Sequence, residues 1–126
     1  MNELLLVESI VIARVQVLMI NDIPDLTPVT FHCQSQGRDL GVRNVPTNGP
    51  VEWYMDIYNT KNEAAYCDLR YRDLHGSLDI YETKRDYRTG RCRNNQCLWS
   101  VRKDGLYLYN KKADIYEFQF GWEVNQ

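Results

Sequence analysis

Apolar and polar side chains alternate along most of this 126-residue chain, and this period of two limits its fold more than any other feature. In the segment 51–58, VEWYMDIY, one face carries the apolar residues Val51, Trp53, Met55 and Ile57. Acidic residues occupy two of the positions between them. A strand buried on one face shows this period, whereas an amphipathic helix repeats its apolar positions about every 3.6 residues. The alternation therefore predicts β-strands.

Segments with this pattern recur between turn residues, at 13–21, 29–33, 51–58, 65–71, 77–82, 98–110 and 115–122. We expect 98–110 to be a hairpin, because Asp104-Gly105 at its centre is a strong turn signal. The pattern gives about eight short strands, with no long amphipathic helix and no internal repeat. It predicts an all-β fold, a sandwich or a barrel, in a single domain over 1–126 with its core at about 13–123.

Aromatic residues concentrate near the C-terminus, where Tyr116, Phe118, Phe120 and Trp122 share one face of a predicted strand. An alternating aromatic stripe usually packs inside a protein core. We therefore assign Phe118 and Phe120 to the core, together with Trp53.

Two connections between the predicted strands are long. Residues 34–50 are rich in Gly, Asn and Pro, and residues 83–96 are polar and basic. Long loops on a rigid sheet commonly carry function. The stretch 84–95 fits a patch for an acidic receptor surface or an acidic polysaccharide, and it fits a solvated loop equally well.

The charge balance is acidic overall but uneven. The net charge is -2 and the pI is near 5.6, which argues against a general nucleic-acid or membrane-surface binder. Between residues 70 and 103, nine basic and four acidic residues give a charge of +5, so the rest of the chain carries -7. We expect no nucleic-acid partner.

The N-terminal residues do not form a signal peptide of the usual kind, because Glu3, Glu8 and Arg14 interrupt the apolar stretches. No stretch is long enough to span a bilayer, so we expect no membrane insertion. This N-terminus fits a cytosolic protein, and it fits equally well a secreted protein whose signal sequence has been replaced by Met1.

The four cysteines bear on that choice: Cys33, Cys67, Cys92 and Cys97. An even count in a small domain fits two disulfides, with three possible pairings. A structural zinc site usually needs two close cysteine pairs, and this chain has one. Cys33 and Cys67 fall in phase with core-facing residues of separate strands, where they are well placed to bridge. Cys92 and Cys97 flank RNNQ and would close a tight loop.

A search for catalytic chemistry finds little. The two histidines, His32 and His75, would form a ribonuclease-type pair only if both converged on one phosphate with a cation nearby. Nothing in their spacing indicates this, and surface positions are expected for both. The chain has no G-x-S-x-G elbow, no phosphate-binding glycine loop and no metal-ligand cluster. We expect no enzyme, no cofactor and no bound metal.

Several segments together resemble the plant self-incompatibility S1 family, the secreted S-protein homologues that include the poppy stigma determinants. The resemblance runs from about Val15 to Trp122. The first family element appears as Cys33, Gln34, Ser35, Asp39, Leu40 and Gly41. The C-terminal element appears as Cys92, Cys97, Trp99, Asp104 and Gly105, and Cys67 takes the place of the mid-chain cysteine.

The resemblance implies an antiparallel β-sandwich with the disulfides Cys33–Cys67 and Cys92–Cys97. It implies a secreted, extracellular, monomeric ligand that meets a pollen membrane receptor. Recognition of self pollen would then lead to inhibition through calcium signalling and cell death. The chain departs from the family pattern in having DLRY after Cys67, where tryptophan or phenylalanine is frequent, and in lacking an N-x-[ST] sequon.

We expect the receptor contacts in two exposed segments, 70–75 and 84–95. The predicted contact residues are Arg70, Arg72, Asp73, His75, Asp79, Lys84, Arg85, Asp86, Tyr87 and Arg88. The alternative function is a cell-wall polysaccharide or lectin-like binding module, which a row of exposed aromatic residues would favour. An enzyme would require His32 and His75 to converge in a pocket.

Overall fold

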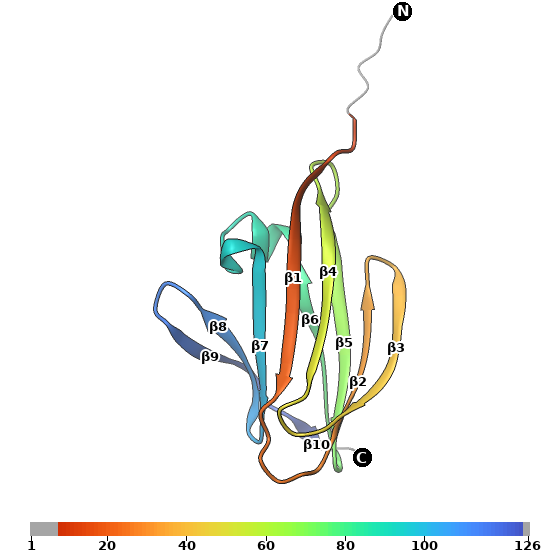
Figure 1. Cartoon of the computed structure of the whole chain (residues 1–126), viewed down its shortest axis with the longest axis vertical. Helices are drawn as coiled ribbons and strands as arrows, with labels where there is room; N and C mark the ends of the chain where they lie inside the picture. The colour runs from red at the N-terminus through yellow and green to blue at the C-terminus, as the bar shows by residue number, and fades with distance from the viewer. Residues whose placement is uncertain (1–7, 125–126) are drawn as a thin grey trace, which may run out of the picture.

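The computed structural model of the chain describes residues 8–124, apart from the side chain of Arg93, and this part contains ten β-strands in two sheets (Figure 1). The first sheet has the order β4 (Pro50–Tyr58), β1 (Val11–Asn21), β7 (Gln96–Arg102), β8 (Gly105–Asn110) and β9 (Ile115–Phe120). The second has the order β10 (Glu123–Val124), β6 (Leu74–Glu82), β5 (Ala64–Tyr71), β2 (Val29–Ser35) and β3 (Arg38–Val45). The predicted all-β sandwich is confirmed.

The structure has two strands more than the alternation predicts. Strand β3 lies within the expected loop 34–50, and β10 contains two residues. Only Val45 of β3 is buried, because β3 is an edge strand whose other side chains reach solvent or are half-covered. A strand without a buried face has no apolar alternation, so the sequence pattern could not reveal it.

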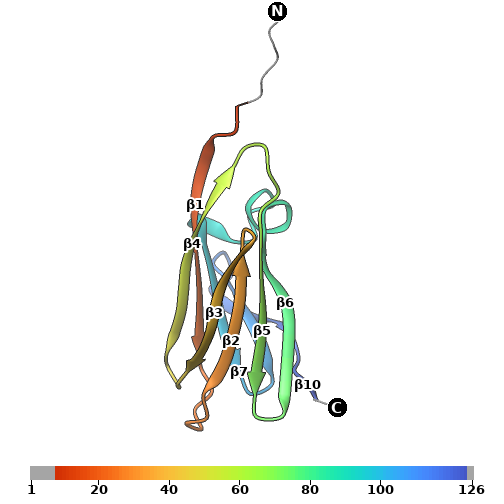
Figure 2. The same ribbon diagram turned by 90° about the vertical axis from the view of Figure 1, so that its right-hand side faces the viewer.

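One strand pair is parallel, although the fold is otherwise antiparallel over the described residues. Strand β1 pairs antiparallel with β4 and parallel with β7, and this places Val17 between Trp53 and Cys97. The chain reaches β7 from β6 of the other sheet, so the connection between them crosses from one layer to the other. In Figure 2, β1 and β4 of the first sheet lie at the left, and β2 and β5 of the second sheet pass in front of β7.

The core lies between the sheets. The inward residues Val17, Met19 and Trp99 of the first sheet and Phe31 and Leu69 of the second are all nearly inaccessible to solvent. Such large buried side chains each contribute about 2–3 kcal/mol by leaving water.

Both disulfides form in the pairing that the resemblance implies. Cys33 and Cys67 lie directly opposite each other on β2 and β5, inside the core. The Cys92–Cys97 disulfide joins the β6–β7 connection to the start of strand β7, and both cysteines are buried.

The expected core positions of Phe118 and Phe120 are wrong. Phe118 is 55% exposed and Phe120 is 44% exposed, whereas Trp53 is half-buried and packs against the core. Strand β9 is the edge of the first sheet, and Figure 1 shows the β8–β9 hairpin splayed away from the rest of the sandwich. Phe118 lies opposite Tyr107, whose neighbours Leu106 and Leu108 face the core, so Phe118 points to the outer face of the hairpin.

The predicted hairpin is confirmed, but its turn is at Lys103-Asp104, and Gly105 is the first residue of β8, opposite Arg102. Gly105 has φ +148°, and a Cβ atom there would clash with the carbonyl oxygen of Phe120. Glycine is therefore required both by the backbone conformation and by the close approach of β9. Beyond β9, Trp122 packs against Tyr71, with ring centroids 6.0 Å apart, where the chain passes to the second sheet.

Candidate functional site

The polar β6–β7 connection is an ordered coil, and it carries half of the predicted contact residues. Its first part, η1 (Thr83–Tyr87), is a π-helical turn closed by the hydrogen bond from the Arg88 amide to the Thr83 carbonyl, 3.0 Å. Its end contains the short turn η2 (Arg93–Asn95). The Cys92 amide donates to the Asp86 carbonyl at 2.9 Å, which fixes the path of the chain between the two turns.

The buried carboxylate of Asp86 organises this connection. Its side chain is about 1% exposed. Oδ1 accepts hydrogen bonds from Arg85 Nε at 2.9 Å and from Arg91 Nη1 at 3.1 Å. Oδ2 accepts from Arg85 Nη2 at 2.7 Å and from the Glu82 amide at 2.8 Å. A buried carboxylate is stable only with such partners.

The prediction that Asp86 contacts a receptor is therefore corrected, because Asp86 faces the interior and holds the two arginines in place. The hydrogen bond to Asp86 raises the pKa of Arg85, whereas burial lowers the pKa of Arg91. Arg91 also donates from Nη2 to Gln119 Oε1 at 2.8 Å, which ties the connection to β9.

The remaining predicted residues of this connection reach solvent to different degrees. Lys84 and Arg88 are exposed, and their side chains have no ion pair or hydrogen bond with any residue in the described range 8–124. Arg85 and Tyr87 are half-buried. Lys84 and Arg88 are thus the cations here that a partner can reach at least cost.

The other predicted segment lies at the turn between β5 and β6. Arg72 donates from Nη2 to Asp25 Oδ2 at 3.0 Å and to Thr27 Oγ1 at 3.2 Å, so it is engaged within the molecule. The Tyr71 hydroxyl also donates to Asp25 and is the main cause of the lowered pKa of that carboxyl. Asp73 is exposed in the turn.

The structure does not bring the two predicted segments together. The β5–β6 turn and η1 lie at opposite ends of β6, as Figures 1 and 2 show. A nine-residue strand such as β6 is about 27 Å long. Arg70, His75 and Asp79 lie between these ends, with Arg70 and Asp79 exposed and His75 half-buried. The predicted residues therefore form two surfaces.

Both histidines line a groove of about 340 Å³ on the outer face of the second sheet. In the strand register, His32 lies opposite Asp68 of β5, and Arg70 of β5 lies opposite His75 of β6. Strand β5 therefore separates the two imidazoles by two strand spacings, about 10 Å, and they are also offset along the strands. His32 Nε2 lies 2.9 Å from Asp39 Oδ1, and His75 Nε2 lies 3.3 Å from Glu123 Oε1.

This groove meets one condition for an enzyme, since both histidines and the cation Arg70 line it. The other condition is that a general acid and a general base both lie within about 3 Å of one reacting group, and the two histidines are on strands separated by β5. Each imidazole is instead paired with its own carboxylate, His32 with Asp39 and His75 with Glu123.

Asp86, Cys92 and Cys97 place one potential ligand atom each within 4.8 Å of one another. The two sulfur atoms are joined in a disulfide, whereas a cysteine binds zinc as a thiolate. In the oxidised protein this cluster has no thiolate ligand to offer.

Comparison with known proteins identifies what the chain is similar to. The model of the family described as plant self-incompatibility protein S1 matches residues 16–122. S-protein homolog 5 of Arabidopsis thaliana is 29% identical over 92 residues, which are 73% of this chain and 69% of that protein. S-protein homolog 27 of the same species is 32% identical over 94 residues, 73% of this chain and 59% of that protein.

Self-incompatibility protein S1 of Papaver rhoeas is 30% identical over 92 residues, covering 71% of this chain and 63% of that protein. The chain thus spans roughly two thirds of the length of these relatives. No solved structure matches it.

Proposed function

The chain belongs to the plant self-incompatibility protein S1 family, and from this premise we propose that it is a secreted, non-catalytic recognition ligand. Its partner would be a membrane receptor of pollen, and binding would trigger inhibition of self pollen through calcium signalling and cell death. The sandwich would act as the frame, and the β6–β7 connection would act as the contact surface.

The arrangement around Asp86 is the observation that carries this proposal. A stretch with five basic residues and one acidic residue between 83 and 96 is held in one conformation by buried hydrogen bonds and by the Cys92–Cys97 disulfide. A cationic loop that is already ordered loses less conformational entropy on binding than a flexible one. Lys84 and Arg88 point their charges outward, where they favour an acidic receptor surface.

Secretion fits the two disulfides, since such bonds persist in oxidising compartments. None of the helices in residues 8–124 is long and apolar enough to cross a membrane.

A pollen bioassay with the refolded protein tests the proposal. The protein is added to pollen of several genotypes, and tube growth and cytosolic calcium are recorded. We expect growth arrest and a calcium rise in some genotypes only. The absence of any effect on every genotype would count against a receptor ligand.

Two matched double variants locate the contact. Lys84→Glu with Arg88→Glu reverses the outward charges of the β6–β7 connection, and we expect it to abolish the arrest. Arg38→Glu with Lys103→Glu makes the same change in charge at exposed positions elsewhere, and we expect it to leave the arrest intact. If both double variants lost the growth arrest equally, the arrest would depend on the net charge of the protein and not on the position of these residues.

A further inference from the structure

The outer face of the β8–β9 hairpin carries four aromatic rings in two cross-strand pairs. Tyr107 lies opposite Phe118, with ring centroids 5.5 Å apart and an edge-to-face angle of 76°. Tyr109 lies opposite Tyr116, with centroids 5.1 Å apart. Phe118 and Tyr116 are 55% and 37% exposed. Exposed aromatic surface of this kind is unusual on a soluble domain and commonly marks a binding site.

These rings are held in position before any ligand arrives. The Tyr107 hydroxyl donates to Asp104 Oδ2 at 2.6 Å, and the Tyr109 hydroxyl donates to Asp114. Each tyrosine thus has both its ring packed and its polar end bonded. A rigid aromatic platform binds at a small cost in entropy.

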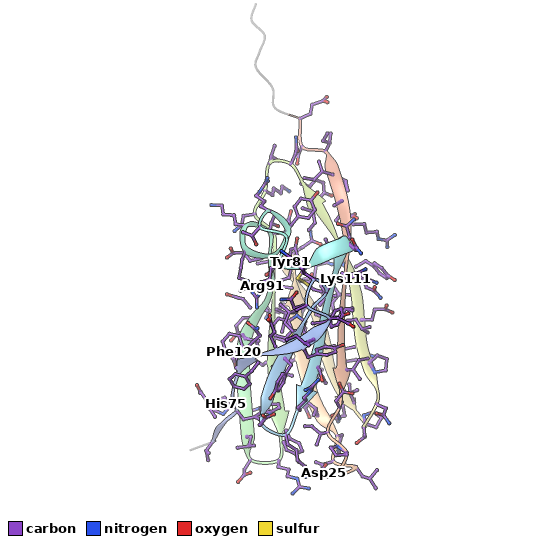
Figure 3. All side chains as sticks on the ribbon, turned by 90° about the vertical axis from the view of Figure 1, so that its left-hand side faces the viewer. Asp25, His75, Tyr81, Arg91, Lys111 and Phe120 are labelled. Atoms are coloured by element: carbon purple, nitrogen blue, oxygen red, sulfur yellow. A yellow bond between two sulfur atoms is a disulfide. The ribbon has the colours of Figure 1, made fainter. Side chains whose placement is uncertain are left out.

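One cation lies between the two aromatic pairs and another lies at one end of the row. The guanidinium of Arg102 lies over Tyr107, 4.3 Å from the ring centroid, and 5.2 Å from the centroid of Tyr116. At the end of the row, Lys111 and Tyr109 line a depression of about 150 Å³. Lys111 is exposed in the turn of the hairpin, and Figure 3 faces the side of the molecule on which this hairpin protrudes.

The neighbouring β6–β7 connection adds to the positive charge. Its residues 83–96 carry +4, and the chain as a whole carries -2, so the remainder carries -6. A second cavity, of about 260 Å³, lies between this connection and the hairpin, and its charged lining residues are Arg91, Lys112 and Glu117. The hairpin itself, over residues 102–120, has four basic and three acidic residues, so the aromatic row lies on a segment of net charge +1 beside the basic connection.

We propose that the outer face of the β8–β9 hairpin binds an acidic polysaccharide, a chain of uronate residues. The C–H face of each sugar ring would stack on Phe118 and Tyr116, and the carboxylates would pair with Lys111 and with the exposed edge of Arg102. This binding goes beyond the receptor recognition proposed above and uses different side chains. It would retain the secreted protein at an extracellular polysaccharide.

Charge distinguishes this occupant from a second copy of the chain. In a two-fold symmetric dimer the same patch of both subunits meets. Such a contact through the hairpin would bring the basic connection of one copy close to that of the other. A polyanion instead neutralises both the connection and Lys111.

Affinity electrophoresis in gels containing polygalacturonate tests the proposal on the whole chain, with gels containing a neutral β-glucan as the comparison. We expect retardation by polygalacturonate that weakens as salt is raised, because the pairing charges are exposed. The neutral glucan should retard the protein much less. Equal retardation by both polymers, or none by polygalacturonate, would overturn the proposal.

Two hairpin variants and one control complete the design. We expect about tenfold weaker binding for Tyr116→Ala with Phe118→Ala, from the loss of two stacking contacts, and for Lys111→Gln with Lys112→Gln, from the loss of two charges. Tyr54→Ala with Tyr66→Ala removes two exposed aromatic rings elsewhere and should change binding less than twofold. Thermal unfolding of each variant verifies that it is folded, and the lysine pair tests the site even if the aromatic pair unfolds.

Other occupants give different results. A concentration-dependent dimer in light scattering that is abolished by Phe118→Ala would replace the polysaccharide with a second copy. Sedimentation with anionic vesicles but no retardation by polygalacturonate would replace it with a lipid surface. Because Lys84 and Arg88 are unchanged in the hairpin variants, a loss of polysaccharide binding with intact pollen arrest leaves the receptor proposal standing.

Discussion

The guanidinium of Arg91 lies 3.1 Å from the buried carboxylate of Asp86, five residues earlier in the chain. This ion pair holds two parts of the β6–β7 connection together. The hydrogen bond from Arg91 to Gln119 attaches the connection to β9. The shape of the basic surface therefore depends on a residue that does not itself reach solvent.

Replacing Asp86 by Asn should destabilise the protein by about 3 kcal/mol, because the change leaves two arginines without their counter-charge. The figure is at the low end for buried pairs, since the side chains of Arg85 and Arg91 stay 35% and 25% exposed. Urea unfolding measures the loss, and hydrogen exchange should show faster opening of residues 83–95. Asp79→Asn, at an exposed position nearby, should cost under about 0.5 kcal/mol. An equal cost for both variants would contradict the role of Asp86.

The two disulfides should contribute unequally to the free energy of unfolding. Removing Cys33–Cys67, which closes a loop of 34 residues, should cost about 4 kcal/mol by the chain-entropy estimate. Removing Cys92–Cys97, with a separation of five, should cost about 2 kcal/mol. Paired Cys→Ala variants, unfolded in urea under identical conditions, provide the comparison. A larger loss from the short loop would indicate that the basic connection is coupled to the core more strongly than loop entropy implies.

Phe118 should behave as a surface residue in spite of its place in an alternating aromatic stripe. Phe118→Ala should change the free energy of unfolding by less than about 1 kcal/mol, because the ring is 55% exposed. The matched substitution Phe31→Ala, at a ring that is 1% exposed, should cost about 3–5 kcal/mol. Chemical unfolding of the two variants tests this directly, and similar costs would return Phe118 to the core.

Tyr81 should make stability depend on pH in the alkaline range. Its buried hydroxyl has no hydrogen-bond partner within the described range 8–124, and burial raises its pKa from 10.0 to about 12. The unfolded chain loses this proton first, so stability should fall by up to about 3 kcal/mol as pH rises from 10 to 12.

In Tyr81→Phe this part of the alkaline loss should disappear. Below pH 10 the variant should be as stable as the parent or more stable by about 1 kcal/mol, because it removes an unpaired buried polar group. Unfolding curves of the two proteins across the alkaline range, recorded side by side, isolate Tyr81 from the other tyrosines. Parallel curves would show that its hydroxyl is solvated in the folded state.

The strands with one buried face follow from the order of residues. Val51 and Met55 alternate with acidic residues, and Cys33 and Cys67 share the phase of core residues on their own strands. The β7–β8 hairpin is also signalled locally, by Asp104 in its turn and by Gly105 directly after it. These features depend on neighbours along the chain, so the sequence by itself determined them.

The exposed aromatic face and the buried carboxylate depend on how the segments are arranged in the tertiary structure. Phe118 has the same alternation as a core residue, but its pairing with Tyr107 puts it on the outer face of the hairpin, away from the buried Leu106 and Leu108. Asp86 looks like one charge among many in a basic loop, and it is buried because Arg85, Arg91 and the Cys92–Cys97 disulfide close around it. Alternation tells which side chains share a face of a strand. The tertiary structure alone decided which of those faces is covered, because covering is a contact between segments far apart in sequence.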